Sequence, residues 1–146
     1  MNDDERKRDR QMLELLNELR IALPGVQILF AFLLTVPFSA RFDELTPFQS
    51  DVYYVTLIAT ALSAACLIAP SAAHRLRFHR GEREWIVESA NRLMITGLVF
   101  LAAALGGSVL LITDVMFDGA RVWIYSGAVA LCIVGLWFLR PLARNL

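Results

Sequence analysis

The residues most able to do chemistry in this sequence are four hydroxyl-bearing side chains that recur every three or four positions. They are Tyr53, Thr56, Thr60 and Ser63. On a helix this spacing places them on one face. Hydroxyls on an apolar helix bond to a neighbouring helix, or they line a polar path for an ion or a small solute. Because packing faces of this kind are common in helical bundles, we interpret the four as a packing face and keep the solute path as the alternative.

The other polar candidates lie inside or beside long uncharged segments. Gln27 is the one carboxamide within such a segment, where it either bonds a neighbouring helix or binds an ion or a polar ligand, and we favour the helix contact. Asp114 lies at the end of another segment, where Arg41 or Arg121 could pair with it. The remaining candidates fit anchoring at the membrane interface better than a proton relay. They are His74, Arg75, Asn91 and Arg92.

No group of residues in the sequence has the spacing of a catalytic or metal site. His74 and His79 are five residues apart, and no cysteine pair lies nearby to complete a metal site. Cys66 and Cys132 are typical of small apolar packing residues. No nucleophile stands beside a base, and there is no glycine-rich phosphate loop. We therefore expect no catalytic residues, no metal and no cofactor.

These candidates must be positioned by four segments that contain no Asp, Glu, Lys, Arg or His. Each segment is 18 residues or longer. A bilayer core about 30 Å thick needs about 20 helical residues to cross it, and only a helix satisfies the backbone of an isolated segment in lipid. The sequence therefore predicts an all-α integral membrane protein, a bundle of four transmembrane helices in two hairpins. The expected spans are about 21–40, 52–70, 93–113 and 122–139.

The composition agrees with a membrane protein and excludes several other classes. Of the 146 residues, 57% are hydrophobic and 19% are charged, and the mean hydropathy is +0.54. Two cysteines are too few for a secreted scaffold held by disulfides. Fourteen basic residues balance fourteen acidic ones, so a nucleic-acid partner attracted by net positive charge is excluded.

The basic residues predict the orientation of the spans. Twelve of the fourteen Lys and Arg residues lie before the first span, between the second and third, or after the fourth. Only Arg41 and Arg121 lie in the other two linkers, beside five acidic residues. Because positive residues are retained in the cytoplasm, we predict a multi-pass protein of the cell membrane with both termini cytoplasmic. Phe38 stands where signal peptidase needs a small residue, so we expect the first span to stay in place.

Residues 1–20 form a polar lead-in to the transmembrane domain of residues 21–146. Within the lead-in, apolar residues recur at helical spacing, which predicts an amphipathic helix on the cytoplasmic side. These residues are Met12, Leu15, Leu16 and Leu19. Such a helix either lies along the membrane surface or extends the first span. Pro24 can open a new helix or kink a continuous one, so both arrangements stay open and the surface arrangement is preferred.

Local signals mark the helix boundaries. Residues 46–49, Thr-Pro-Phe-Gln, have the pattern of a capping box, so the second helix should start there. Pro70 should end or kink that helix, and Gly81 is typical of a helix stop, after which 82–115 can form one long helix. Small residues four positions apart predict close helix contacts. The pairs are Ala102 with Gly106, Ala103 with Gly107, and Ser126 with Ala130.

The lipid bilayer is the first partner that the sequence predicts. Anionic headgroups could bind the arginines between the second and third spans, although topology alone also places basic residues there. These arginines are Arg75, Arg77, Arg80 and Arg83. A second copy of the chain or another membrane protein is a further candidate partner, because faces of small residues favour helix association.

Three stretches of the chain and one residue pair carry a family resemblance. The stretches are 18–38 (ELRIALPGVQILFAFLLTVPF), 41–54 (RFDELTPFQSDVYY) and 68–81 (IAPSAAHRLRFHRG), and the pair is Asn91 with Arg92. In these parts, from residue 18 to about residue 117, the sequence resembles an uncharacterised family of small four-span membrane proteins common in actinobacteria. The resemblance implies the four-span architecture and no activity. It also marks the first places to look for a site: Pro24, Gln27, Asp51, His74 and Arg75.

From these observations we expect a membrane protein without enzyme activity that works through contacts, as a scaffold, an accessory subunit or an organiser of the lipid surface. The alternative is a small transporter or channel for ions or solutes that forms its path by oligomerising through the second helix. Burial of the hydroxyl residues inside one subunit would favour packing, and their exposure at a symmetric interface would favour transport. A third class is a lipid-modifying enzyme that uses His74, Arg75 and Asn91.

Overall fold

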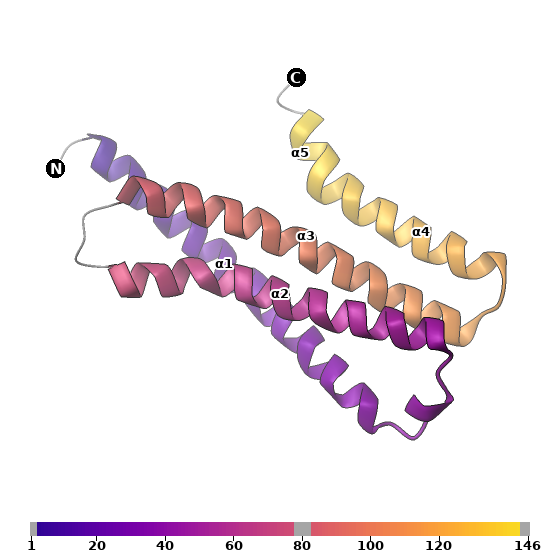
Figure 1. The fold of residues 1–146 in the computed structure, drawn as a ribbon. Helices are drawn as coiled ribbons and strands as arrows, with labels where there is room; N and C mark the ends of the chain where they lie inside the picture. Colours follow the sequence, from indigo (N-terminus) through magenta and orange to yellow (C-terminus); the bar gives the residue numbers. More distant parts are fainter. Residues whose placement is uncertain (1–2, 78–82, 144–146) are drawn as a thin grey trace.

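The computed structural model describes residues 3–77 and 83–143, and within them every regular element is a helix. The long helices are α1 (Asp3–Thr35), α2 (Pro47–Arg77), α3 (Arg83–Met116) and α4 (Ala120–Val134). Two short 3-10 turns, η1 (Val36–Phe38) and η2 (Phe42–Glu44), connect α1 to α2. A π-helical segment, η3 (Gly135–Leu139), joins α4 to the short α5 (Arg140–Ala143). Figure 1 shows that consecutive long helices run in alternating directions along the bundle.

Four helical segments are long and apolar enough to cross a membrane. They are Leu19–Phe38, Pro47–Ala73, Ser89–Met116 and Ala120–Leu139. Each overlaps one of the spans expected from the sequence, and the second and third extend beyond those spans at both ends. The all-α fold with four apolar helices is therefore confirmed, and length and composition define a multi-pass membrane protein.

The first helix is continuous, contrary to the preferred arrangement with a separate helix along the membrane surface. α1 runs from Asp3 through Pro24 to Thr35. Proline lacks the N–H that would bond the carbonyl four residues earlier, and here that carbonyl belongs to Arg20. Arg20 lies at the very start of the apolar span, where water or headgroups can satisfy a free carbonyl. The proline therefore costs this helix little, and its apolar face continues unbroken.

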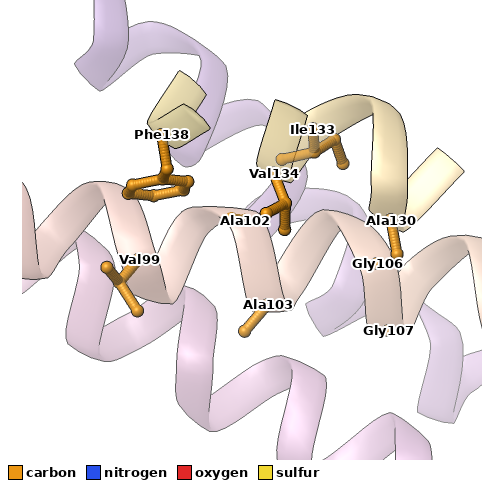
Figure 2. Close-up of a pocket in the computed structure, with 9 residues that line it drawn as sticks. All are labelled: Val99, Ala102, Ala103, Gly106, Gly107, Ala130, Ile133, Val134 and Phe138. Atoms are coloured by element: carbon orange, nitrogen blue, oxygen red, sulfur yellow. The ribbon is translucent and has the colours of Figure 1, made fainter. Parts of the chain in front are cut away.

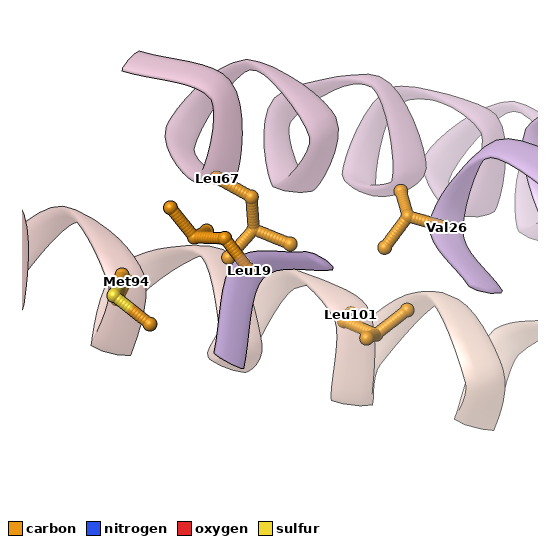
Figure 3. Close-up of a cluster of buried hydrophobic side chains, with 5 residues drawn as sticks. All are labelled: Leu19, Val26, Leu67, Met94 and Leu101. Atoms are coloured by element: carbon orange, nitrogen blue, oxygen red, sulfur yellow. The ribbon is translucent and has the colours of Figure 1, made fainter. Parts of the chain in front are cut away.

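That apolar face explains why α1 is one continuous helix. Leu19, Val26 and Leu33 repeat every seven residues and are all buried. A repeat of seven keeps one seam of a helix against its neighbours over several turns. Figure 3 shows Leu19 and Val26 meeting Leu67 of α2 and two α3 side chains, Met94 and Leu101. The core therefore joins three helices, with α1 packed across the α2–α3 pair.

The second helix begins where the capping box predicts and continues past the proline that was expected to end or kink it. The Thr46 N–H donates to Gln49 Oε1 (3.0 Å), and the Gln49 N–H donates to Thr46 Oγ1 (3.3 Å). This reciprocal pair confirms the capping box. Pro70 is buried inside the helix, which runs on to Arg77. Phe78 and Gly81, the end of the expected amphipathic piece and the expected helix stop, lie outside the described residues.

The four helices do not contribute equally to the bundle. α2 and α3 share the most extensive interface, α1 packs on both of them, and among the described residues α4 packs on α3 alone. Large side chains of α4 are correspondingly exposed, Trp123, Ile124 and Leu131 among them. Figure 1 shows α4 beside α3 on the side away from α2. In a membrane these apolar faces contact lipid or another protein.

Two glycines allow α2 and α3 to approach closely. A Cβ on Gly107 would overlap the Thr56 hydroxyl and approach its Cβ at 3.3 Å. A Cβ on Gly97 would come within 2.9 Å of the Leu67 side chain. Gly106, by contrast, has nothing within 4 Å of the place where a Cβ would stand. Of the two adjacent glycines on α3, only Gly107 faces α2 at close range.

This asymmetry predicts opposite effects for alanine at two adjacent glycines. Gly107→Ala should destabilise the fold by about 1–3 kcal/mol, because the new methyl displaces the buried Thr56. Gly106→Ala should be neutral or stabilising by up to about 1 kcal/mol through helix propensity. Reversible unfolding in detergent micelles measures both. The double variant Gly107→Ala with Thr56→Ala should recover part of the loss, and equal effects of the two single variants would contradict the close approach.

Candidate functional site

The hydroxyl face, made of Tyr53, Thr56, Thr60 and Ser63, is buried inside a single subunit. Tyr53 and Thr56 are each 2% exposed, and Thr60 and Ser63 are 0% exposed. The sequence left open whether this face packs or lines a path. Its burial against α3 and α1 favours packing, because a solute path needs a wet lining.

Each hydroxyl of this face donates to a backbone carbonyl. Thr56 Oγ1 donates to the carbonyl of Val52 (2.6 Å) and Thr60 Oγ1 to that of Thr56 (2.8 Å), so both bond back along their own helix. Ser63 Oγ crosses to α3 and donates to the carbonyl of Gly97 (2.8 Å). Each hydroxyl has one O–H donor, and in all four residues that donor is occupied by a backbone carbonyl. None of the four can therefore donate a hydrogen bond to an anion or a solute.

Tyr53 ties α2 to the end of α1. Its hydroxyl donates to the carbonyl of Leu33 over 3.0 Å. In a regular helix that carbonyl would bond the N–H four residues on, but that position is Pro37, which has none. Burial without a partner would be costly, so the tyrosine replaces the missing backbone donor. The ring of Phe42 packs edge-on against Tyr53, with centroids 5.5 Å apart, and closes this end of the core.

Asp114 binds Gln49 and not the arginines expected from the sequence. Gln49 Nε2 donates to Asp114 Oδ2 over 2.9 Å, which links the start of α2 to the end of α3. Arg41, on the linker between η1 and η2, and Arg121, in the first turn of α4, are both exposed. The capping box explains the outcome, because it holds Gln49 Oε1 on the Thr46 N–H and so directs the amide nitrogen towards α3. A short side chain already fixed in place loses less entropy on bonding than a mobile arginine.

Gln27 makes no contact of the kind expected from the sequence. Its side chain is exposed, and no described residue of the subunit hydrogen-bonds to it. The expected bond to a neighbouring helix is therefore absent within the described subunit. The reason is the register of α1: Val26 faces the core, and one further residue rotates the side chain about 100° away.

The structure describes only some of the candidates near the other end of the bundle. Arg75, Asn91 and Arg92 are exposed, and the carbonyl of Arg92 accepts a bond from Thr96 Oγ1 (2.9 Å). The His74 side chain lies outside the described residues, as do the side chains of Arg77 and Arg83 and the whole of His79 and Arg80.

The described residues offer no metal site: no group of three or more His, Cys, Asp or Glu side chains among them could hold an ion. Cys66 is half-buried and Cys132 is exposed, and both are free thiols. Cys66 lies beside Gly97, where the two helices meet.

An apolar groove of about 460 Å³ separates part of α3 from α4, and we call it the α3–α4 groove. Figure 2 shows its lining, which consists of small residues on α3 and larger ones on α4 and η3. The lining residues are Val99, Ala102, Ala103, Gly106, Gly107, Ala130, Ile133, Val134 and Phe138. No side chain among them carries a polar atom, so the groove can hold an apolar chain and cannot do chemistry.

Two features of the bundle were not anticipated from the sequence. The Gln49–Asp114 bond was missed, although the capping box had already fixed Gln49 and left its amide nitrogen free. Ser126 was assigned only to a small-residue pair with Ala130. It is 8% exposed, and its Oγ has no partner among the described residues. No sequence signal distinguishes it from serines that bond back along their helix, as Ser108 does to Ala104.

The fold and these contacts define a class, a multi-pass all-helical membrane protein whose buried hydroxyls stabilise helix packing. Within that class, the profile of a family of unknown function, DUF6328, matches residues 2–141. The chain belongs to this family, which agrees with the uncharacterised family expected from its sequence. Searches of curated proteins and of solved structures found no match.

The Gln49–Asp114 bond predicts a measurable coupling between α2 and α3. Asp114→Ala should cost roughly 1–2 kcal/mol of unfolding free energy, because a hydrogen bond to a carboxylate is lost. Gln49→Ala should cost more, because the capping box is lost as well. In a double-mutant cycle the two losses should be non-additive by roughly 1 kcal/mol. Asp118→Ala, on the exposed linker, is the matched control, and additive losses would contradict the bond.

Proposed function

We propose that this protein has no enzyme activity and works through contacts within the membrane, as a scaffold or accessory subunit. The observation that carries the proposal is the burial of the hydroxyl face, with Thr60 and Ser63 fully buried and each hydroxyl bonded to a backbone carbonyl. The hydroxyl face is thus used for packing. What remains for function is the outer surface of the helices.

The shape of the bundle supports a role in contacts. α4 packs on α3 alone among the described helices, and the α3–α4 groove opens between them. An open apolar groove and a one-sided helix suit association with lipid chains or apolar helix faces, which is how accessory membrane proteins bind their partners. The alternative is a transporter whose path lies at an interface formed by α2 and is lined by the hydroxyl face. The hydroxyl face is not available for such an interface, because α3 already covers it.

Flux through proteoliposomes tests this proposal. The purified protein in liposomes with a potassium or proton gradient should give no flux above protein-free liposomes, because the hydroxyl face that would line a path is buried against other helices. Gramicidin serves as the positive control for both ions. Flux that appears with the wild-type chain and falls in Thr60→Val, which removes one buried hydroxyl at nearly constant volume, would overturn the proposal in favour of transport.

We further propose that the protein lies in the cell membrane with both termini cytoplasmic. Figure 1 shows that the N-terminus, the end of α2 and the start of α3 lie at one end of the bundle, and the linkers 36–46 and 117–119 at the other. The first end carries most of the arginines, whereas at the second end the acidic residues, Asp43 and Asp118 among them, outnumber the arginines. This charge asymmetry supports the orientation. Anionic headgroups at Arg75 and its neighbouring arginines belong to the same proposal.

Reporter fusions test the orientation. After Leu146, a reporter that works in the cytoplasm should be active and a reporter that works outside the cell should be inactive. Between residues 43 and 50 the result should be the reverse. A paired alkaline phosphatase and fluorescent protein series reads both compartments. The reverse pattern at Leu146 would contradict the proposed topology.

A further inference from the structure

We propose that α1 docks against α1 of a second copy of this chain, with the two Gln27 carboxamides hydrogen-bonded to each other. Gln27 is exposed inside an apolar span, and no described residue of its own subunit bonds to it. The dimer goes beyond the proposed function and does not depend on it, because it follows from α1 alone.

The depth of Gln27 makes an unpaired side chain costly. It is the ninth residue of the 20-residue span Leu19–Phe38, so its Cα lies within about 2–3 Å of the middle of that span. Water is absent at this depth, and a carboxamide exposed to lipid loses all its hydrogen bonds. The headgroups lie roughly 15 Å away, which is beyond the reach of a glutamine side chain. The amide therefore needs a partner beside it.

The described residues of the subunit do not supply that partner. The face of α1 that packs on α2 and α3 carries Leu19, Val26 and Leu33 and lies about 100° round the helix from Gln27. α4 contacts only α3 among the described helices, so it does not cover Gln27. The missing hydrogen-bond partner must come from a second chain.

The exposed face of α1 has the spacing of a helix-packing seam. Pro24, Gln27, Ala31 and Leu34 follow each other at intervals of three and four, and all are exposed; together they form the Gln27 face. Intervals of three and four keep residues on one seam between nearly parallel helices. Ala31 follows Gln27 by one turn, and its small side chain lets two backbones come close enough for the amides to meet.

The chemistry of this face selects a second copy as the partner. Copies inserted with the same orientation hold Gln27 at the same depth, and a two-fold axis along the membrane normal places the two side chains opposite each other. A carboxamide both donates and accepts, so two of them can form a reciprocal pair of hydrogen bonds. An unrelated helix would need a polar group at that same depth. One polar residue in an apolar seam also fixes the register of such a pair.

Association in lipid tests the dimer. Single-molecule photobleaching of labelled protein in large liposomes, at a series of protein-to-lipid ratios, gives the dimerisation constant. Gln27→Leu should weaken dimerisation about tenfold or more, and Gln27→Asn, which keeps the carboxamide, should weaken it less. Phe32→Leu is the matched control, because Phe32 is exposed about 140° round the helix from Gln27 and should leave the constant unchanged.

Cross-linking locates the interface independently. In a background with Cys66→Ala and Cys132→Ala, Ala31→Cys should form a disulfide-linked dimer under mild oxidation, and Phe32→Cys should not. Helix content by circular dichroism, together with unfolding in detergent, shows that each variant folds. A wild-type chain that stays monomeric, an unchanged constant in Gln27→Leu, or cross-linking at Phe32 in place of Ala31 would each overturn the dimer. None of these results bears on ion flux, so the proposed function is tested separately.

Discussion

The close approach of α2 and α3 is the constraint on which the rest of the bundle depends. Gly107 and Gly97 leave room for Thr56 and Leu67, and Ser63 crosses the gap to the Gly97 carbonyl. In lipid there is no hydrophobic force between helices, so such steric fit and interhelical hydrogen bonds must hold them together. α1 then packs on the pair that results, and α4 is added on α3 alone.

This constraint divides the polar groups of the spans into two kinds. Those on the α2–α3 side, such as Thr60 and Tyr53, are buried and satisfied by backbone carbonyls. Gln27 lies on the outside of α1, where no described residue of the subunit hydrogen-bonds to it. Buried and satisfied groups stabilise one arrangement of helices, whereas an exposed and unsatisfied group favours association with another chain. The hydroxyls between α2 and α3 are thus occupied in packing, whereas the Gln27 carboxamide is available to a partner outside the subunit.

The sequence predicted those features that depend on local physics. The four uncharged runs set the number of helices, and Thr46 with Gln49 set the start of α2, because lipid solvation and capping act over a few residues. It left two arrangements open at Pro24 and preferred a separate helix, and it expected α2 to end or kink at Pro70. Both helices continue through their prolines, because helix continuity depends on which carbonyl loses its partner and on tertiary packing. The partners of Gln27 and Asp114 could not be predicted either. They depend on rotational register and on which neighbour is already fixed in place.

The central claim is that the hydroxyl face is a dry packing seam, and the accessibility of a cysteine at its centre tests this most directly. The background chain carries Cys66→Ala and Cys132→Ala, and Thr60→Cys is introduced into it. A membrane-impermeant thiol reagent is then added to both sides of sealed vesicles. Ser39→Cys, on the exposed linker, serves as the reactive control. We predict that the thiol at position 60 stays unlabelled while the thiol at position 39 reacts. Labelling of residue 60 at a comparable rate in the folded protein would mean that water reaches the seam, which would contradict the claim.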